Sequence, residues 1–261
     1  MKISETTTII SQEKLCEGIY SIWLDTSIAK EAECGQFISV YPNSESKLLP
    51  RPISICEIDN GSGSLRLVYR VAGEGTAEFS RMKEGDRLRV IGPNGNGFFA
   101  ALREDITRDT KALLIGGGIG IPPMLELAKR LDCSVSVVAG YRCDKEMFLT
   151  NELSDAAALY VSTDDGSFGT AGTVIDAIKQ NGLDADVIFA CGPKPMLKGV
   201  KNLAQELSVP AYVSMEERMA CGIGACLACV CTSTDIDEHS KVNNKRVCAD
   251  GPVFNVSEVV L

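Results

Sequence analysis

The fold is decided by the stretch ALLIGGGIGIPP, which occupies residues 112–123. Its first four residues form a strand-like apolar run, and its prolines open a helix-like stretch over 122–131. A glycine loop between a strand and a helix exposes backbone N–H groups at the helix N-terminus and favours anion binding. Gly116 and Gly118 match the dinucleotide-binding pattern, but Ile121 stands at the third glycine position. The stretch therefore predicts a nucleotide site, with a close-packed turn that binds nothing as the alternative.

Outward from this loop, strand-like and helix-like stretches alternate. We expect further strands at 134–139, 159–162, 187–190 and 211–213, and helices at 173–180 and 195–207. Such alternation is typical of a doubly wound parallel sheet, whose ligands bind at the carboxyl ends of the strands. Cys191-Gly192-Pro193 also follows a strand and precedes a helix, so we expect this loop beside the glycine loop. The turn from Asp164 to Gly169 is expected to border the same crevice.

The first hundred residues follow a different pattern. Short runs rich in β-branched and aromatic residues, at 19–24, 36–41 and 65–71, are separated by turns such as Asp59-Asn60-Gly61. Several short strands at this spacing indicate a small antiparallel β-barrel. A short helix is expected at 77–82.

Three segments of this barrel are candidates for phosphate binding. Arg51 and Arg70 could clamp a diphosphate, because the guanidinium fork matches phosphate oxygens. Gly75 and Thr76 could supply N–H and hydroxyl donors at the start of the short helix. Tyr69 offers a flat aromatic face. Solvated arginines, a tyrosine in the core and plain turns remain the alternatives.

Composition and charge exclude several classes of protein. The chain has 261 residues with 45% hydrophobic and 23% charged residues, which suits a globular protein of more than one domain. A net charge of −9 without a basic tract argues against nucleic acid as a partner. No apolar run approaches the length of a membrane span, and residues 1–8 lack the layout of a signal peptide. We therefore expect a cytoplasmic protein.

The cysteines predict a metal centre near the C-terminus. Of eleven cysteines, five fall within the last 41 residues. Cys221, Cys226 and Cys229 have the spacing C-x4-C-x2-C, and Cys248 follows after 18 residues, which is the plant-type [2Fe–2S] arrangement. Gly222 and Gly224 allow a tight loop around a compact cluster.

Other interpretations of these cysteines stay open. A zinc site also uses four thiolates, although usually as two CxxC pairs, and buried structural thiols are a further alternative. We expect Cys231 to be a packed or free thiol, with a ligand role as its alternative. His239, the only histidine, could replace a cysteine, but its polar surroundings favour a solvated loop.

The order of these motifs resembles the ferredoxin reductase superfamily. Within it, the chain is most similar to the electron-transfer subunits of class 1B dihydroorotate dehydrogenases. The most specific segments are 217–226 and 247–254, and the resemblance spans essentially the whole chain. It implies three parts: an FAD-binding antiparallel β-barrel (1–101), a doubly wound NAD-binding α/β domain (102–215) and a small [2Fe–2S] module (216–261).

The resemblance also implies which residues bind the cofactors. FAD would be bound by Arg51, Pro52, Ile53, Ser54, Val68, Tyr69, Arg70, Gly75 and Thr76. NAD would be bound by Gly116, Gly117, Gly118, Ile119, Gly120, Cys191, Gly192 and Pro193. The cluster would be bound by Cys221, Cys226, Cys229 and Cys248. The superfamily commonly has tyrosine where this chain has Ile53, so a stacking role does not carry over, and the cluster loop would cover that part of the flavin instead.

The implied function is electron transfer in pyrimidine biosynthesis. Electrons from dihydroorotate, oxidised on a partner subunit that contains FMN, would pass through the cluster and FAD to NAD+, in a heterotetramer with two of each subunit. No acid–base or nucleophile constellation is evident, so no catalytic side chain is expected. One alternative is the flavin and iron–sulfur subunit of another oxidoreductase, such as a sulfide dehydrogenase or a ferredoxin–NADP reductase. Another is a binding module stabilised by zinc. Arg142 would favour NADP and Asp144 NAD, which leaves the nucleotide preference open.

Overall fold

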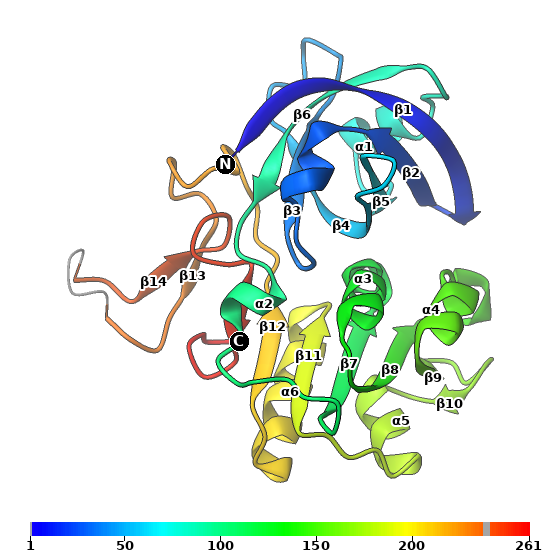
Figure 1. The fold of residues 1–261 in the computed structure, drawn as a ribbon, viewed down its shortest axis with the longest axis vertical. Coiled ribbons are helices and arrows are strands. Elements are labelled where there is room, and N and C mark those ends of the chain that lie inside the picture. Colours follow the sequence, from blue (N-terminus) through cyan, green and yellow to red (C-terminus); the bar gives the residue numbers. More distant parts are fainter. Residues whose placement is uncertain (1, 237–240) are drawn as a thin grey trace.

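The computed structural model describes residues 2–236 and 241–261, and two lobes lie one above the other in it (Figure 1). The first lobe is a closed antiparallel barrel in the strand order β1-β2-β5-β4-β3-β6. Its strands are β1 (Ile3–Cys16), β2 (Ile19–Asp25), β3 (Phe37–Tyr41), β4 (Arg51–Asp59), β5 (Ser64–Arg70) and β6 (Arg87–Asn94). The antiparallel barrel expected from the sequence is confirmed.

Alternation along β5 divides its side chains between two environments. Leu65, Leu67 and Tyr69 pack in the barrel core. Val68 points the other way, into the apolar cluster that the barrel shares with the second lobe. This is the two-residue period of a strand that is buried on both faces.

The second lobe is a seven-stranded sheet in the order β10-β9-β8-β7-β11-β12-β15. Its strands are β7 (Lys111–Gly117), β8 (Ser134–Tyr141), β9 (Ala158–Thr163), β10 (Thr170–Ala171), β11 (Val187–Cys191), β12 (Ala211–Ser214) and β15 (Val253–Asn255). The first six run parallel, and β15 is antiparallel to β12. The doubly wound parallel sheet is confirmed, with an antiparallel edge strand supplied by the C-terminal segment.

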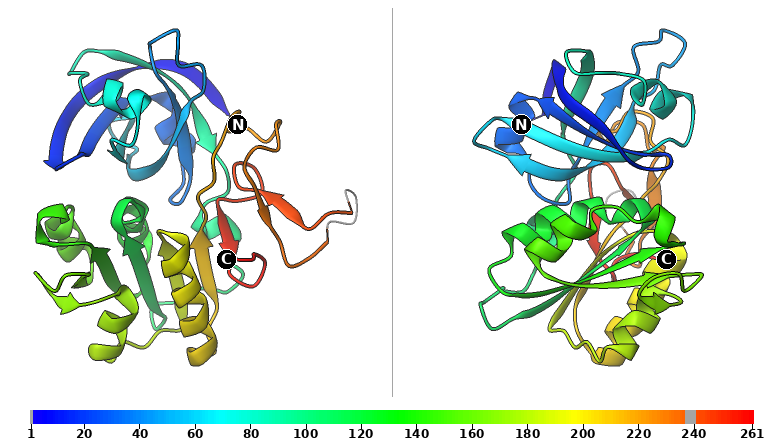
Figure 2. Two further views of the ribbon diagram at one scale, coloured as in Figure 1. Left: turned by 180° about the vertical axis from the view of Figure 1, so that it is seen from behind. Right: turned by 90° about the vertical axis from the view of Figure 1, so that its right-hand side faces the viewer.

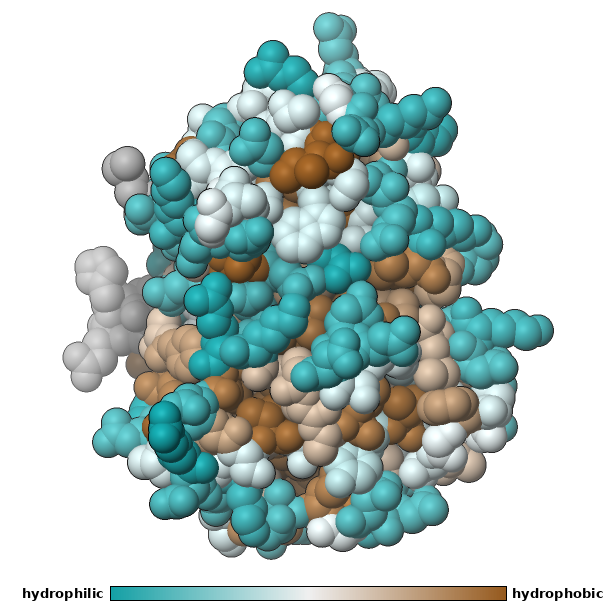
Figure 3. All heavy atoms as spheres, turned by 45° about the vertical axis from the view of Figure 1, so that its right-hand side comes forward, coloured by the Kyte–Doolittle hydropathy of each residue, from teal (hydrophilic) through white to brown (hydrophobic). Residues whose placement is uncertain are grey.

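Helices cover both faces of this sheet. On one face, α3 (Pro122–Arg130) and α4 (Thr150–Ala156) lie toward the barrel, whereas α5 (Val174–Gln180) and α6 (Lys194–Leu207) lie on the opposite face (Figures 1 and 2). Along β7, Ala112 and Leu114 pack with α3, and Leu113 and Ile115 pack with α5 and α6. Burial on both faces explains the uninterrupted apolar run of this strand. On the face drawn in Figure 3, hydrophilic residues dominate the barrel, and hydrophobic residues form a band across the sheet lobe.

The C-terminal segment extends beside both lobes. Its β13 (Val230–Thr232) and β14 (Asn244–Arg246) form a two-stranded antiparallel sheet (Figure 1). The short α2 (Phe98–Ala101) lies where the chain leaves the barrel. Among residues 2–236 and 241–261, no helix combines the length and the apolar character needed to cross a membrane.

Helices α1 and α4 differ from expectation, and the short α2 was not expected either. The short helix expected at 77–82 is α1 (Glu74–Phe79), because the Thr76 hydroxyl accepts the backbone N–H groups of Ala72 (2.9 Å) and Gly73 (3.2 Å) and so starts the helix earlier. Helix α4 was not expected, because only Leu153 among its seven residues is buried and no helical period is visible.

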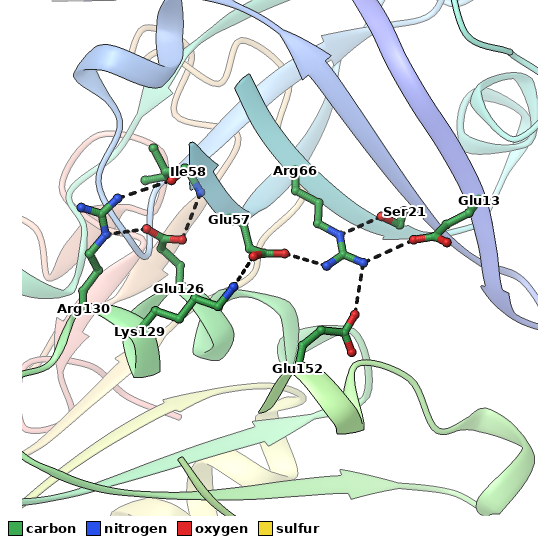
Figure 4. A network of polar contacts seen from close by, with 9 residues as sticks. All are labelled: Glu13, Ser21, Glu57, Ile58, Arg66, Glu126, Lys129, Arg130 and Glu152. Atoms are coloured by element: carbon green, nitrogen blue, oxygen red, sulfur yellow. Dashed lines mark hydrogen bonds and ion pairs between the residues drawn. The ribbon is translucent and has the colours of Figure 1, made fainter. Parts of the chain in front are cut away.

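A buried polar network joins the two lobes (Figure 4). Arg66 of β5 is 5% exposed and donates to Glu57 (2.6 Å), Ser21 (2.8 Å) and, across the lobes, Glu152 of α4 (3.5 Å). Lys129 of α3 pairs with the same Glu57. A second bridge links Glu126 of α3 to the backbone N–H of residue 58 in β4 (3.0 Å). These contacts fix how the barrel lies over α3 and α4.

Candidate functional site

A cavity of about 530 Å³ opens at the carboxyl ends of the parallel strands. The glycine loop and the Cys191-Gly192-Pro193 loop both border it, because β7 and β11 are parallel neighbours with Gly116 opposite Cys191. From the glycine loop, Gly117, Gly118, Ile119 and Gly120 line the cavity; from the second loop, Gly192 and Pro193 do so. Gly116 and Cys191 lie behind this lining, and both are buried.

The two loops touch through positions that only glycine can occupy. A Cβ atom at Gly120 would lie 2.2 Å from the Cys191 carbonyl oxygen, and one at Gly117 would lie 2.5 Å from the Met196 sulfur. Gly118 has φ +52°, in the left-handed region. The glycines therefore serve close packing as well as an open cavity wall, and nucleotide binding at this loop stays a prediction.

Two buried polar atoms in this region have no hydrogen-bond partner among the described residues. They are Nε of Arg70 and Oγ of Ser162, and both residues line the cavity. A buried polar group without a partner costs stability, so such groups usually mark a ligand or water position. The orphaned donors and the open glycine wall fit a phosphate-containing nucleotide.

Sequence reasoning missed Glu216 as part of the cavity wall. Its side chain is exposed to the solvent of the cavity, but protein surrounds it on most sides. Desolvation raises the pKa of this carboxyl group, and Arg70 opposes the increase. Arg142 and Asp164 also line the cavity, whereas Asp144 does not. Glu216 lies just beyond the carboxyl end of β12 (Ala211–Ser214), and this position was the only feature of the sequence that could have indicated its place in the cavity wall.

On the barrel, Arg51 lies directly against the first turn of α1. A Cβ atom at Gly75 would lie 2.5 Å from the Arg51 Nε, and the Arg51 Nη1 donates to the Leu49 carbonyl (2.7 Å). The first turn of a helix leaves N–H groups without intrahelical partners. A guanidinium and free N–H groups thus meet at one place, which suits a diphosphate. Pro52, Ile53 and Ser54 follow in β4 and are half-buried.

The side chains of Tyr69 and Thr76 already make contacts within the protein. The Tyr69 ring is 2% exposed, stacks on Tyr20 at 6.0 Å and donates its hydroxyl to Gln12 (3.1 Å). The core alternative therefore holds for Tyr69, and its flat face cannot meet a ligand. The Thr76 hydroxyl caps α1, as described above, so its contribution to a ligand is limited to its backbone.

The four predicted cysteine ligands form two pairs. The backbone N–H of Cys221 donates to the Cys226 sulfur (3.4 Å), and the N–H of Cys248 donates to the Cys229 sulfur (3.4 Å). The Cys221 sulfur also accepts N–H groups from Ile223 (3.5 Å) and Ala225 (3.3 Å). Peptide donors directed at sulfur are what an iron–sulfur loop provides.

The pKa values of Cys221 and Cys248 are shifted in opposite directions. Burial raises the pKa of Cys221, but hydrogen bonds from Ile223, Cys226 and Ala225 outweigh burial and lower its pKa to about 6. For Cys248, burial and the adjacent Cys229 thiol raise the pKa to about 12. A neighbouring metal would deprotonate all four thiols.

Within the described part of the chain, no three side chains from His, Cys, Asp and Glu are grouped so that they could hold a single metal ion. A zinc site usually takes its four thiolates from two CxxC pairs, whereas a [2Fe–2S] cluster uses three clustered cysteines and one distant one. The spacing of Cys221, Cys226, Cys229 and Cys248 is therefore the feature that favours a [2Fe–2S] cluster over zinc.

The cysteine loop lies against the barrel. A Cβ atom at Gly222 would lie 2.6 Å from the Ser39 hydroxyl of β3, and Ser39 pairs with Pro52 of β4. The loop is thus next to the Arg51–Ser54 segment, where the superfamily tyrosine is missing. The structure brings the three groups of predicted residues together where the two lobes and the C-terminal segment meet.

Cys231 is a buried thiol. It is 6% exposed in β13 and packs in the same apolar cluster as Cys229 and Cys248, and burial raises its pKa. His239 lies outside the described residues.

A barrel joined to a nucleotide-type sheet, with a cysteine loop at their junction, defines an oxidoreductase of the ferredoxin reductase class. A solved structure of an NADH-dependent reduced ferredoxin–NADP oxidoreductase superposes with a TM-score of 0.84 at 31% identity, covering 97% of this chain and 89% of that one. Residues 216–260 match the family model for the iron–sulfur cluster binding domain of dihydroorotate dehydrogenase B.

Curated relatives narrow the class to one family. The dihydroorotate dehydrogenase B (NAD(+)) electron transfer subunit of Geobacillus thermodenitrificans is 42% identical over 262 residues, 98% of each chain. That of Listeria monocytogenes is 42% identical over 257 residues, 97% of each chain. The chain belongs to the family of dihydroorotate dehydrogenase B electron transfer subunits, and it is an oxidoreductase subunit that transfers electrons.

Proposed function

We infer that the chain transfers electrons from the oxidation of dihydroorotate on an FMN-containing partner subunit to NAD+, in pyrimidine biosynthesis. One observation carries the proposal: the cysteine loop lies against β3 of the barrel at Gly222 and Ser39, while Arg70 of the same barrel and Glu216, just before the cysteine loop, line the nucleotide cavity. Membership of the family supports the choice of substrate.

The cofactor residues follow from the geometry. Cys221, Cys226, Cys229 and Cys248 would hold a [2Fe–2S] cluster. The half-buried strand Arg51–Ser54, Arg70 and the first turn of α1 at Gly75 and Thr76 would hold FAD, with Val68 and Tyr69 contributing backbone. The loops at Gly116–Gly120 and Cys191–Pro193 would hold NAD, with Gly116 and Cys191 shaping the loops from behind.

The protein sets the conditions for these groups. When bound, the cluster supplies one-electron transfer, and the flavin links single electrons to the hydride that nicotinamide accepts. The chain directs N–H groups of residues 223 and 225 at one sulfur, keeps Cys229 and Cys248 buried, and directs Arg70 at the junction of the two lobes. The division into 1–101, 102–215 and 216–261 assigns one cofactor to each part, although β15 of the last part completes the sheet of the second.

An electron transfer subunit implies a catalytic partner. We place an FMN subunit in that role, in a heterotetramer with two copies of each. A cytoplasmic location is consistent with eleven cysteines that are all free thiols, because such thiols persist in a reducing compartment.

Co-purification from the native source tests the proposal. We expect two irons and one FAD per chain, an attached FMN subunit, and dihydroorotate:NAD+ activity. Zinc without flavin absorbance would overturn the cofactor assignment. Cys226→Ser is expected to lose or alter the iron–sulfur spectrum, and Cys231→Ser, its matched control, is expected to leave the spectrum intact.

The similarity to an NADH-dependent ferredoxin–NADP oxidoreductase favours a second candidate, a flavin and iron–sulfur subunit of such a complex. Activity with ferredoxin or sulfide and none with dihydroorotate would support that candidate and contradict the first.

A further inference from the structure

One arginine is connected to the cysteine loop from outside it. Arg246, the last residue of β14, donates from Nη1 to the Gly224 carbonyl (2.9 Å). Asp250 holds the guanidinium through two bonds, from Nη2 (2.8 Å) and Nε (3.1 Å), and also accepts the Arg246 backbone N–H (2.7 Å). The arginine therefore has one orientation, fixed by a fork-to-fork ion pair.

The peptide group that contains the Gly224 carbonyl makes a second hydrogen bond through its N–H. The N–H of that same peptide is the Ala225 N–H, which donates to the Cys221 sulfur (3.3 Å). In a trans peptide the C=O and N–H groups point in opposite directions, so the guanidinium and the sulfur lie at its two ends. A donor at the carbonyl polarises the amide and strengthens the bond that its N–H makes.

We propose that Arg246 is a positioning residue that raises the reduction potential of the cluster, acting on the Cys221 sulfur through the Gly224–Ala225 peptide. The inference rests on the proposed cluster site. Reduction adds one electron, and thus one negative charge, to the cluster beside this sulfur. Net charge and hydrogen bonds to sulfur are the quantities that set such potentials.

Asp250 sets how strongly Arg246 acts on the reduction potential of the cluster. Its carboxylate neutralises part of the arginine charge and keeps the guanidinium on the Gly224 carbonyl. Arg246 lies two residues before Cys248 in the chain, and its Nη1 donates to the Gly224 carbonyl of the Cys221–Cys226 loop, so the positive charge is linked to both halves of the site. The loop packs closely against the segment after β14, because a Cβ atom at Gly224 would lie 2.9 Å from the Ala249 Cβ.

Potentiometric titration of the purified complex, followed by the electron paramagnetic resonance signal of the reduced cluster, tests the proposal. Arg246→Gln is expected to shift the midpoint to a lower potential, and Arg246→Lys to restore part of the shift. Asp250→Asn is expected to shift it upward, because the arginine charge is then less neutralised. Arg108→Gln removes the same charge from an exposed ion pair with Asp132 and is expected to leave the midpoint unchanged.

Amide exchange at Ala225 gives a second measurement, because Arg246→Gln should increase its exchange rate. A midpoint in Arg246→Gln equal to that in Arg108→Gln, with two irons still bound, would overturn the proposal. Equal downward shifts of the midpoint in Arg246→Gln and Asp250→Asn would also overturn the proposal. If the Arg246–Asp250 pair only held the loop in place, loss of either partner would shift the midpoint in the same direction. Absence of iron from the unmodified protein would instead refute the cluster site itself.

Discussion

At the residue scale, Gly120 shows how closely the two nucleotide loops approach each other. Gly120→Ala would place a methyl group 2.2 Å from the Cys191 carbonyl oxygen, and backbone cannot move aside cheaply. Overpacking of this kind costs about 1–3 kcal/mol of unfolding free energy. We expect a lower Tm and weaker NADH binding, measured by calorimetry. Gly73→Ala, where a Cβ atom meets nothing within 4 Å, is the control and should keep the Tm.

We expect nucleotide binding to depend on pH, because the Glu216 carboxyl group lines the cavity and has a raised pKa. Desolvation already raises the pKa of this carboxyl group in the open cavity, and a bound nucleotide would exclude more water and raise its pKa further. Binding is then accompanied by proton uptake, so NADH affinity should decrease as pH rises through the raised pKa. Glu216→Gln stays neutral and should flatten the profile, measured by titration between pH 5 and 8. An unchanged slope in this variant would contradict the assignment.

The spacing predicts Cys221, Cys226, Cys229 and Cys248 as ligands and Cys231 as a packed thiol, and both assignments stay predictions. Residues two apart on a strand share a face, so alternation alone would have placed Cys231 with Cys229. Cys231 is buried in the same apolar cluster as Cys229 and Cys248, so burial does not distinguish it from them. Tyr69 is a similar case, because its aromatic face depends on which side of β5 meets the barrel core, and that is a tertiary property.

At the element scale, α5 begins beside the cavity and depends on its cap. The Thr173 hydroxyl accepts the Asp176 N–H (3.3 Å), and the Asp176 carboxylate accepts the Thr173 N–H (2.8 Å). Thr173→Ala is expected to cost about 1 kcal/mol in unfolding free energy, and Thr173→Ser much less. Chemical denaturation measures both.

The same cap has a pH signature. Hydrogen bonds from the Thr173 hydroxyl and backbone lower the pKa of Asp176 below its ordinary 3.8. Its contribution is therefore fully present above pH 3.8 and is lost as the pH falls through the lowered pKa. The Thr173→Ala variant should show less of this acid loss than the unmodified protein. Equal acid sensitivity would mean that the cap contributes nothing.

Most elements followed from local sequence, and those that did not have a physical reason. Strands β7, β8 and β11 and helices α3 and α6 were predicted because apolar runs bounded by glycine and proline encode them directly. Helix α4 buries one side chain, and β15 has three residues that pair with a strand about forty residues earlier. Neither element has a hydrophobic periodicity that can be recognised in the sequence, because both are stabilised mainly by tertiary contacts.

At the scale of the whole molecule, the part of the cavity wall that Arg70 forms depends on the orientation of the two lobes. Arg70 of the barrel lies against the glycine loop of the sheet lobe, 3.5 Å from where a Gly118 Cβ would be. The polar network around Arg66 joins the same two lobes (Figure 4). Loss of this network should therefore be detected in the cavity, although none of its members lines the cavity.

Arg66→Met tests this connection between the lobes. It leaves Glu57 buried with Lys129 as its one remaining partner in the network of Figure 4, and breaking a buried pair costs about 3–5 kcal/mol. Glu152→Gln removes only the Arg66–Glu152 bond, one of several between the lobes, which is long (3.5 Å) and partly exposed, so its cost should be about 0–1 kcal/mol. We expect both variants to raise the KM for NADH, and the Kd of FAD, whose residues lie on the barrel, to change little. If Glu152→Gln weakens FAD and NADH equally, the network stabilises the barrel itself and does not align the lobes.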